Sequence, residues 1–229
     1  MKKKKAIVIF SISVLISLGI IFKSETIYIY ELTKIIIKIK RTNADITDYK
    51  YFDNITIPKS KNPKSWPLHN NFNEVISTKK LDSTHKDLGT VAFLIIKNDS
   101  IWYENYYEGY NKNSLSNSFS IAKSIVTALL GRSINEGYLS GLDHKVGDFI
   151  PECSNGLAQN LTVGDLSSMS SGMKWTEDYK NIFGVTARAY VGTGLEKLIK
   201  SRPIISEPGI SFEYLSGDTQ LLAMTIEKA

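Results

Sequence analysis

Ser120 and Lys123 lie three positions apart at the start of an apolar segment that ends at Gly131. In a helix, residues three apart share one face, with their Cβ atoms about 5–6 Å apart. A serine at the first turn also lies at the positive end of the helix, where backbone N–H groups can stabilise a developing oxyanion. A neutral lysine amine can take the proton of a neighbouring serine, so this pair could form an activated nucleophile.

The Ser-x-x-Lys spacing alone is a weak signal, because it occurs four times in this chain. The other three pairs begin at Ser77, Ser83 and Ser171. Only Ser120 opens a long apolar helix, whose apolar positions cover more than half of its surface and predict burial nearly all round. A lysine in such a helix is unusual without a partner. On the helix alone, a plain helix cap with Lys123 extended to water is an equal alternative.

Several elements must position this pair. Residues 90–97 are apolar and β-branched, residues 98–100 have turn chemistry, and residues 101–107 are aromatic, which together predict a β-hairpin with the first strand interior. Thr-x-x-acid patterns at residues 162–165 and 193–196 resemble capping boxes and predict two helix starts.

From about Val91 to Ala229, the sequence resembles the serine β-lactamase and penicillin-binding-protein superfamily. It is most similar to the class C-like branch, which includes esterases, D-aminopeptidases and 6-aminohexanoate-dimer hydrolases. The resemblance is carried by residues 118–124 (SFSIAKS), 161–172 (LTVGDLSSMSSG) and 207–217 (EPGISFEYLSG). It implies an α/β (α+β) fold of the β-lactamase/transpeptidase type, a helical domain beside an antiparallel sheet. The Gly-x-Ser-x-Gly elbow of α/β-hydrolases is absent from the sequence.

The resemblance also implies catalytic roles. Ser120 would be the acylated nucleophile and Lys123 its base. The second motif of the family, Tyr-x-Asn or Tyr-x-Ser, falls on Tyr214 and Ser216, between a Pro-Gly turn and a predicted helix. Tyr214 would relay a proton to the leaving group. Ser216 would orient this network or contact substrate, and an ordinary loop serine is a nearly equal alternative.

Further site residues are expected in the loop of residues 173–190. By resemblance this loop lines the substrate cleft, so Trp175 and Tyr179 are assigned to substrate binding. We expect no cofactor, because no phosphate-binding glycine loop occurs, and no metal, because no ligand cluster occurs. The single cysteine, Cys153, excludes an internal disulfide and a zinc site with several cysteines. The three histidines match no catalytic or metal position and are expected at the surface; they are His69, His85 and His144.

The formal net charge of +5 comes from 28 Lys and Arg against 23 Asp and Glu, and it first suggests a nucleic-acid partner. Nine of the basic and two of the acidic residues lie in residues 1–41, which leaves 19 basic against 21 acidic residues for the rest of the chain. Because the basic character belongs to one end, we expect no nucleic-acid partner.

Residues 6–22 carry no charged side chain and directly follow four lysines. At about 1.5 Å per residue, a helix of this segment would be roughly 26 Å long, a little short of a typical bilayer core. We predict an N-terminal transmembrane helix that anchors the chain in a membrane. The lysine cluster favours a cytoplasmic N-terminus, so the body would be extracytoplasmic, either periplasmic or at the cell surface. A cleaved signal peptide has the same layout and remains the alternative.

We expect three segments along the chain. Residues 1–41 would be the anchor and juxtamembrane stretch, residues 42–88 a polar connector, and residues 89–229 a partial β-lactamase-like serine hydrolase domain. The third motif of the family, of the Lys-Thr-Gly or His-x-Gly type, does not occur after Tyr214. The sheet would therefore be incomplete in this chain, which we expect to be truncated. A separate C-terminal fragment of the same enzyme would then be a partner, without which the chain would be inactive or poorly folded.

The leading hypothesis is a membrane-anchored serine hydrolase that acts through an acyl-enzyme on Ser120. Its substrate would be a small-molecule ester or amide, or a peptide-like molecule. Two alternatives stay open at this point. One is a sensor that is acylated by a β-lactam without turnover, and the other is a non-catalytic truncated remnant. Composition and spacing do not choose the substrate, because this scaffold hosts many chemistries.

Overall fold

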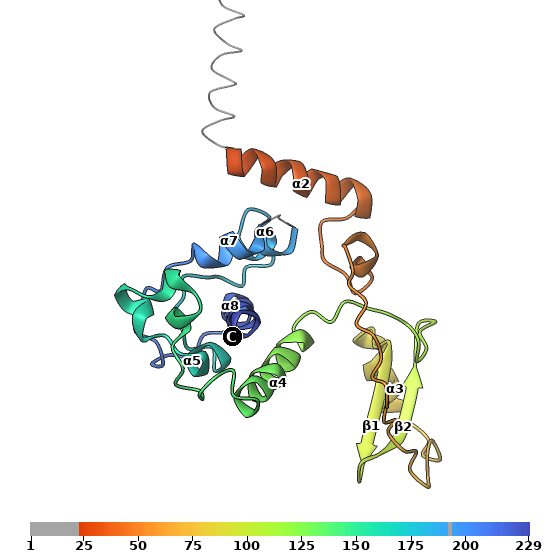
Figure 1. The fold of residues 1–229 in the computed structure, drawn as a ribbon. Helices are drawn as coiled ribbons and strands as arrows, with labels where there is room; N and C mark the ends of the chain where they lie inside the picture. Colours follow the sequence, from red (N-terminus) through yellow and green to blue (C-terminus); the bar gives the residue numbers. More distant parts are fainter. Residues whose placement is uncertain (1–22, 192–193) are drawn as a thin grey trace, which may run out of the picture. The chain divides into compact units, whose positions relative to one another are not determined.

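The computed structural model describes residues 23–191 and 194–229, and the chain divides into two compact units (Figure 1). The hairpin unit is Asp45–Asn117, and the helical unit comprises the described residues of 23–44 and 118–229. The helical unit contains α2 (Lys23–Ile39), α4 (Ile121–Asn135), α5 (Val163–Ser167), α6 (Val185–Val191), α7 (Leu195–Lys200) and α8 (Ser216–Lys228). Its 3₁₀ turns are η2 (Val146–Asp148), η3 (Pro151–Cys153) and η4 (Gly156–Asn160). The hairpin unit contains η1 (Asp48–Tyr51), α3 (Lys79–Asp87), β1 (Ala92–Lys97) and β2 (Ser100–Tyr106).

The predicted hairpin is confirmed. Strands β1 and β2 pair antiparallel, with a register shift between Ile95 and Ile96. The two turn residues, Asn98 and Asp99, both have positive φ, at 49° and 55°. Two-residue hairpin loops favour a turn with positive φ at both central positions, because the twist of this turn matches that of the two strands. Asparagine and aspartate adopt positive φ more readily than most residues. Local turn chemistry therefore fixes this element.

One face of the hairpin is covered by α3, through a buried histidine. The ring of His85 lies 4.6 Å from that of Phe93 and 5.0 Å from that of Tyr107, measured between centroids. His85 is 6% exposed, so its expected surface position was wrong: two aromatic rings enclose it. Only alternate residues of β1 are covered, and Leu94 and Ile96 remain nearly half exposed. The first strand is thus not interior within this unit, contrary to the prediction.

The core of the helical unit forms around α8, which packs against α4, α5 and α7 (Figure 1). Its fully buried side chains are mainly aliphatic, and they include Leu130, Leu139, Val146, Ile150, Leu161, Val163, Leu166, Ile199, Leu215, Leu221 and Leu222. The start of α5 is fixed by the predicted capping box: Asp165 N donates to Thr162 Oγ1, and Thr162 N donates to Asp165 Oδ2. The second predicted box begins at Thr193, outside the described residues.

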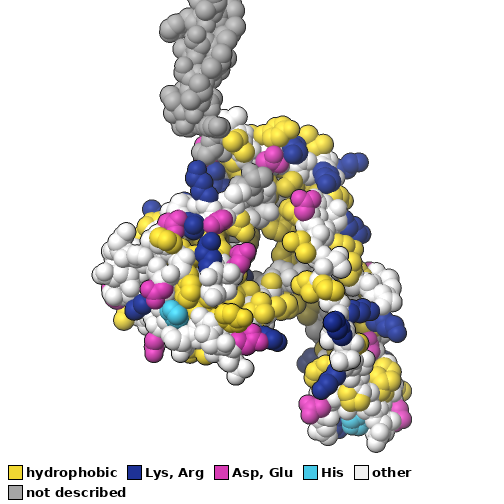
Figure 2. All heavy atoms as spheres, in the orientation of Figure 1, with side chains coloured by type: hydrophobic (Ala, Val, Ile, Leu, Met, Phe, Trp, Pro, Cys, Tyr) yellow, Lys and Arg dark blue, Asp and Glu magenta, His cyan; other side chains and the backbone are white. Residues whose placement is uncertain are grey.

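Helix α4 is less buried than its sequence predicts. Leu130 lies in the core, whereas Ile121, Ile125 and Leu129 are 71%, 58% and 47% exposed. These three residues are four positions apart and form one row along the helix. The row is exposed because α4 packs mainly on α8, which covers a different face. Hydrophobic side chains are accordingly visible on the surface of the helical unit (Figure 2).

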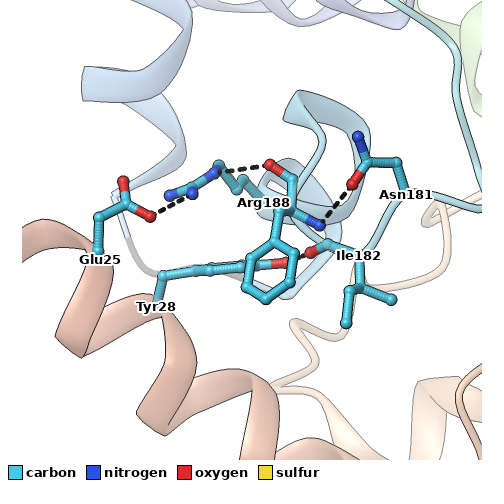
Figure 3. A network of polar contacts seen from close by, with 6 residues as sticks. Glu25, Tyr28, Asn181, Ile182 and Arg188 are labelled. Carbon is cyan, nitrogen blue, oxygen red and sulfur yellow. Dashed lines mark hydrogen bonds and ion pairs between the residues drawn. The ribbon is translucent and has the colours of Figure 1, made fainter.

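Helix α2 joins the helical unit through polar and aromatic contacts with α6 and the loop before it (Figure 3). Glu25 accepts a hydrogen bond from Arg188, whose guanidinium lies 4.4 Å from the ring centroid of Tyr28. The Tyr28 hydroxyl donates to the backbone oxygen of Ile182, and its ring meets that of Phe183 edge to face. These contacts tie residues far apart in the chain into one body.

The predicted fold class needs one correction. In residues 23–191 and 194–229, no helix combines the length and the apolar character needed to cross a bilayer. Helix α2 has 17 residues, and charged side chains of both signs lie along it. The segment to which we assigned the transmembrane helix, residues 6–22, lies outside the described residues. The described fold is therefore an α/β fold with a small, two-stranded sheet and without a transmembrane helix.

Candidate active site

Ser120 and Lys123 lie together at the start of α4. Ser120 is the residue directly before the helix, and Lys123 Nζ is 3.1 Å from Ser120 Oγ. Ser120 is exposed, whereas Lys123 is partly buried. The position of the serine at the N-terminus of a 15-residue helix places it near the positive end of the helix dipole. The local helical spacing thus brings a hydroxyl and an amine within hydrogen-bond distance.

The backbone directly before the serine is strained. Phe119 has a φ of 43°, in the left-handed region that residues with a Cβ seldom adopt. Its ring stacks on that of Tyr190, with centroids 6.2 Å apart and planes 15° apart. Strained backbone of this kind persists where surrounding contacts hold it, and it is common at functional sites. The stacked ring is one contact that holds the turn which presents Ser120.

Tyr214 reaches the same serine from the loop before α8. Its hydroxyl donates a hydrogen bond of 2.7 Å to Ser120 Oγ, across 94 positions of sequence. Its ring lies 5.1 Å from Lys123 Nζ, close enough for a cation–π contact with a protonated lysine. Tyr214 is 40% exposed, so one side of the phenol is open to solvent. The phenol therefore contacts both members of the serine–lysine pair.

Ser216, the first residue of α8, lies on the other side of the lysine. Lys123 Nζ donates to Ser216 Oγ at 3.1 Å, the same distance as to Ser120 Oγ. A continuous hydrogen-bonded chain thus runs from Ser216 through Lys123 and Ser120 to Tyr214. Such a chain can take a proton from the nucleophile and return one to a leaving group.

The two residues assigned to substrate binding lie in different environments. Trp175 is 4% exposed and belongs to the core, where a Cβ on Gly217 would lie 2.8 Å from its Cε3. Tyr179 is 69% exposed, and its hydroxyl donates to Glu177 Oε2 at 2.6 Å. This hydrogen bond, followed by burial and nearby negative charge, raises the pKa of Tyr179 to about 12. Trp175 therefore supports the loop from within, while Tyr179 lies on its surface.

Sequence reasoning missed Glu177. Its carboxylate accepts hydrogen bonds from Trp175 Nε1 at 2.9 Å, from the Tyr179 hydroxyl, and from the backbone N–H of Ser216. The three loop residues follow one another at intervals of two, the spacing that puts side chains on one side of an extended chain. This two-residue spacing could have indicated that Glu177 lies near Trp175 and Tyr179. It could not have predicted the contact with Ser216, which is 39 positions away in the sequence.

Asp218 is a second group that the sequence did not reveal. It is fully buried in the first turn of α8, and Ser171 Oγ donates to its Oδ1 at 2.5 Å. Burial raises the pKa of Asp218 to about 7; the carboxylates of Glu213 and Asp165 add to the rise, and the hydrogen bonds from Ser171 oppose it. This pair ties the loop after α5 to the helix that carries Ser216.

The structure thus brings together Ser120 and Lys123 of the Ser-x-x-Lys motif with Tyr214 and Ser216 of the Tyr-x-Ser motif. The chain belongs to the beta-lactamase family, whose model, described as Beta-lactamase, matches residues 78–229. This confirms the superfamily inferred from the sequence motifs. Within the described residues, no cluster of three or more His, Cys, Asp or Glu could hold a metal ion.

Two solved structures have a similar fold. One is a Bacillus anthracis protein provisionally named a 6-aminohexanoate-dimer hydrolase, with a TM-score of 0.59 and 21% identity over 72% of this chain and 48% of that one. The other is a provisional β-lactamase from Bacteroides dorei DSM 17855, with a TM-score of 0.50 and 20% identity over 66% of this chain and 44% of that one. The chain thus spans about half the length of each. Among curated proteins, none matches.

Proposed function

We propose that this chain carries the nucleophile of a serine hydrolase that cleaves an ester or amide bond through an acyl-enzyme on Ser120. The observation that carries the proposal is the placement of two proton-transfer groups on one hydroxyl: Lys123 Nζ at 3.1 Å and the Tyr214 hydroxyl at 2.7 Å. Membership of the beta-lactamase family supports the general class of reaction.

In the proposed acylation, the neutral amine of Lys123 takes the proton of Ser120 while Oγ attacks the substrate carbonyl carbon. A C–Oγ bond forms, and the carbonyl oxygen becomes an oxyanion close to the positive end of α4. The oxyanion then collapses and the bond to the leaving group breaks. Tyr214 gives its proton to the departing oxygen or nitrogen and receives one from the Lys123 ammonium. The enzyme is left as an acyl-serine, with lysine and tyrosine both neutral.

Deacylation repeats these steps with water as the nucleophile. Water gives a proton to the Lys123–Tyr214 pair and attacks the acyl carbon, and the bond to Ser120 Oγ breaks as the serine regains a proton. Ser216 would hold the amine in place during both halves, because its Oγ is 3.1 Å from Lys123 Nζ. A substrate can reach this site, since Ser120 and Tyr214 are open to solvent, and the substrate that we propose is an ester, amide or peptide-like molecule.

The proposal is tested by covalent labelling of the purified full chain with a fluorophosphonate, which transfers its phosphonyl group to an activated serine and releases fluoride. The third motif does not occur in this chain, so we expect little turnover. Phosphonylation needs only the attack by Ser120, and we therefore expect labelling of the wild type and none of Ser120→Ala. The matched control is Ser124→Ala, an exposed serine of the same helix, which should label like the wild type. Equal labelling of Ser120→Ala and the wild type would contradict the proposal, and so would a wild-type chain that takes no label.

A further inference from the structure

The carboxylate of Glu177 accepts hydrogen bonds from three donors that lie in different parts of the structure. Trp175 Nε1 donates from the core, at 2.9 Å to Oε1. The exposed Tyr179 hydroxyl donates at 2.6 Å to Oε2. The third donor is the backbone N–H of Ser216, which shares Oε1 with the indole. One partly buried carboxylate thus links the core, the loop surface and the candidate active site.

The contact with Ser216 gives a hydrogen-bond acceptor to a backbone N–H at the start of α8. The first four N–H groups of a helix have no partner within the helix. The N-cap residue, Leu215, has no polar side chain to accept one, and so makes no side-chain cap hydrogen bond. Glu177 supplies the acceptor from another segment, and its negative charge lies at the positive end of α8. Hydrogen bonds to a charged acceptor of this kind are among the stronger ones in proteins.

The same residue, Ser216, faces the catalytic lysine. Its Oγ lies 3.1 Å from Lys123 Nζ, while its N–H is bonded to Glu177. Tyr214, two positions earlier, places its hydroxyl on Ser120. A shift of the start of α8 would therefore move the partner of Lys123 and the partner of Ser120 together.

The carboxylate is itself held in place. Trp175 packs against Gly217, so the loop that carries Glu177 and the first turn of α8 are in direct contact. The phenol of Tyr179 is protonated at neutral pH, so it can donate to Glu177, and this hydrogen bond raises its pKa further. Glu177 is thus fixed by two aromatic side chains on its own loop, and it presents a fixed acceptor to Ser216.

We propose that Glu177 is a positioning residue: its carboxylate fixes the start of α8, so that Ser216 and Tyr214 are held against Lys123 and Ser120 for acyl transfer. The inference rests on the proposed function for its kinetic consequence. The structural part of the inference is that Glu177 holds the backbone amide of Ser216. This part can be measured even if the chain has no enzymatic activity.

The test compares four forms of the full chain: the wild type, Glu177→Ala, Glu177→Gln and the control Asp178→Ala. Asp178 is an exposed carboxylate of the same loop whose hydrogen bond goes to the backbone N–H of Lys180. One readout is hydrogen exchange at the amide of Ser216. The other is the rate at which a fluorophosphonate labels Ser120, measured against probe concentration.

We expect Glu177→Ala to speed exchange at Ser216 about 10-fold and to lower the maximal labelling rate by about 10- to 100-fold, as the loss of a charge-assisted hydrogen bond implies. The probe concentration at half-maximal rate should change little, because the residue does not touch the probe. Glu177→Gln should recover most of both losses, since an amide oxygen still accepts from Ser216. Asp178→Ala should match the wild type in both.

The outcomes separate the two proposals. Unchanged exchange at Ser216 in Glu177→Ala overturns the inference, whether or not the chain takes a label. Faster exchange with unchanged labelling of a reactive wild type overturns it as well, because the start of α8 would then not control acyl transfer. An unlabelled wild type would refute the proposed function alone, and the exchange measurement would still decide whether Glu177 fixes this turn.

Discussion

Asp218 gives the structure a specific dependence of stability on pH. This carboxyl group is fully buried, and burial raises its pKa from 3.8 to about 7. The perturbation is Asp218→Asn, which keeps the shape and an oxygen that accepts from Ser171 Oγ but removes the titrating proton. The variant therefore isolates the free energy of ionising this one group.

The sign follows from the two pKa values. Between about pH 4 and pH 7 the unfolded chain has lost the proton of Asp218, whereas the folded chain still holds it. The folded state binds more protons in this window, so the free energy of unfolding decreases as the pH rises. The rise of the Asp218 pKa from 3.8 to about 7 corresponds to at most about 4 kcal/mol of unfolding free energy. This contribution is fully present below pH 4 and is lost by the time the pH has passed about 7.

The assay is urea unfolding of the wild type and Asp218→Asn at several pH values between 4 and 8. The difference between the two cancels the titration of all other groups. We expect the variant to gain stability relative to the wild type as the pH rises, by a few kcal/mol across this range. Asp143→Asn, at an exposed aspartate of the same unit, should show no such trend. A difference between Asp218→Asn and the wild type that stays constant with pH would refute the reasoning.

Two further predictions concern packing and capping. Gly217→Ala would place a Cβ 2.7 Å from Met173 Sδ and 2.8 Å from Trp175 Cε3, so we expect a loss of about 1–3 kcal/mol in urea unfolding; an unchanged midpoint would show that the contact is not tight. Thr162→Ala removes the side chain that caps α5 and should cost about 1 kcal/mol, whereas Thr162→Ser should retain the cap; equal stability of the two variants would contradict the capping role.

The features that the sequence predicted correctly depend on neighbours close in the chain. Asn98 and Asp99 adopt the backbone angles of a hairpin turn, and the strands on both sides follow. Ser120 and Lys123 come together because one helical turn separates them. Tyr214 could be assigned to the same site only by family resemblance, since its contact with Ser120 crosses 94 positions.

The features that the sequence did not predict depend on distant partners. Glu177 and Asp218 are ordinary acidic residues until the fold brings them to Ser216 and Ser171, at separations of 39 and 47 positions. His85 is buried because two aromatic rings of the hairpin enclose it, which its position on a short polar helix gave no reason to expect. In the same way, the spacing of hydrophobic residues along α4 indicates which side chains can be buried, but it does not show which face of the helix packs against another element.

The most direct test of the account is the identity of the residue that an acylating probe modifies. The full chain is treated with a fluorophosphonate, digested, and analysed by mass spectrometry for the modified peptide. The account predicts one modified position, Ser120, because among the serines of residues 23–191 and 194–229 only this one has both Lys123 Nζ and the Tyr214 hydroxyl on its Oγ. Modification at Ser216 or at another serine in place of Ser120 would contradict it.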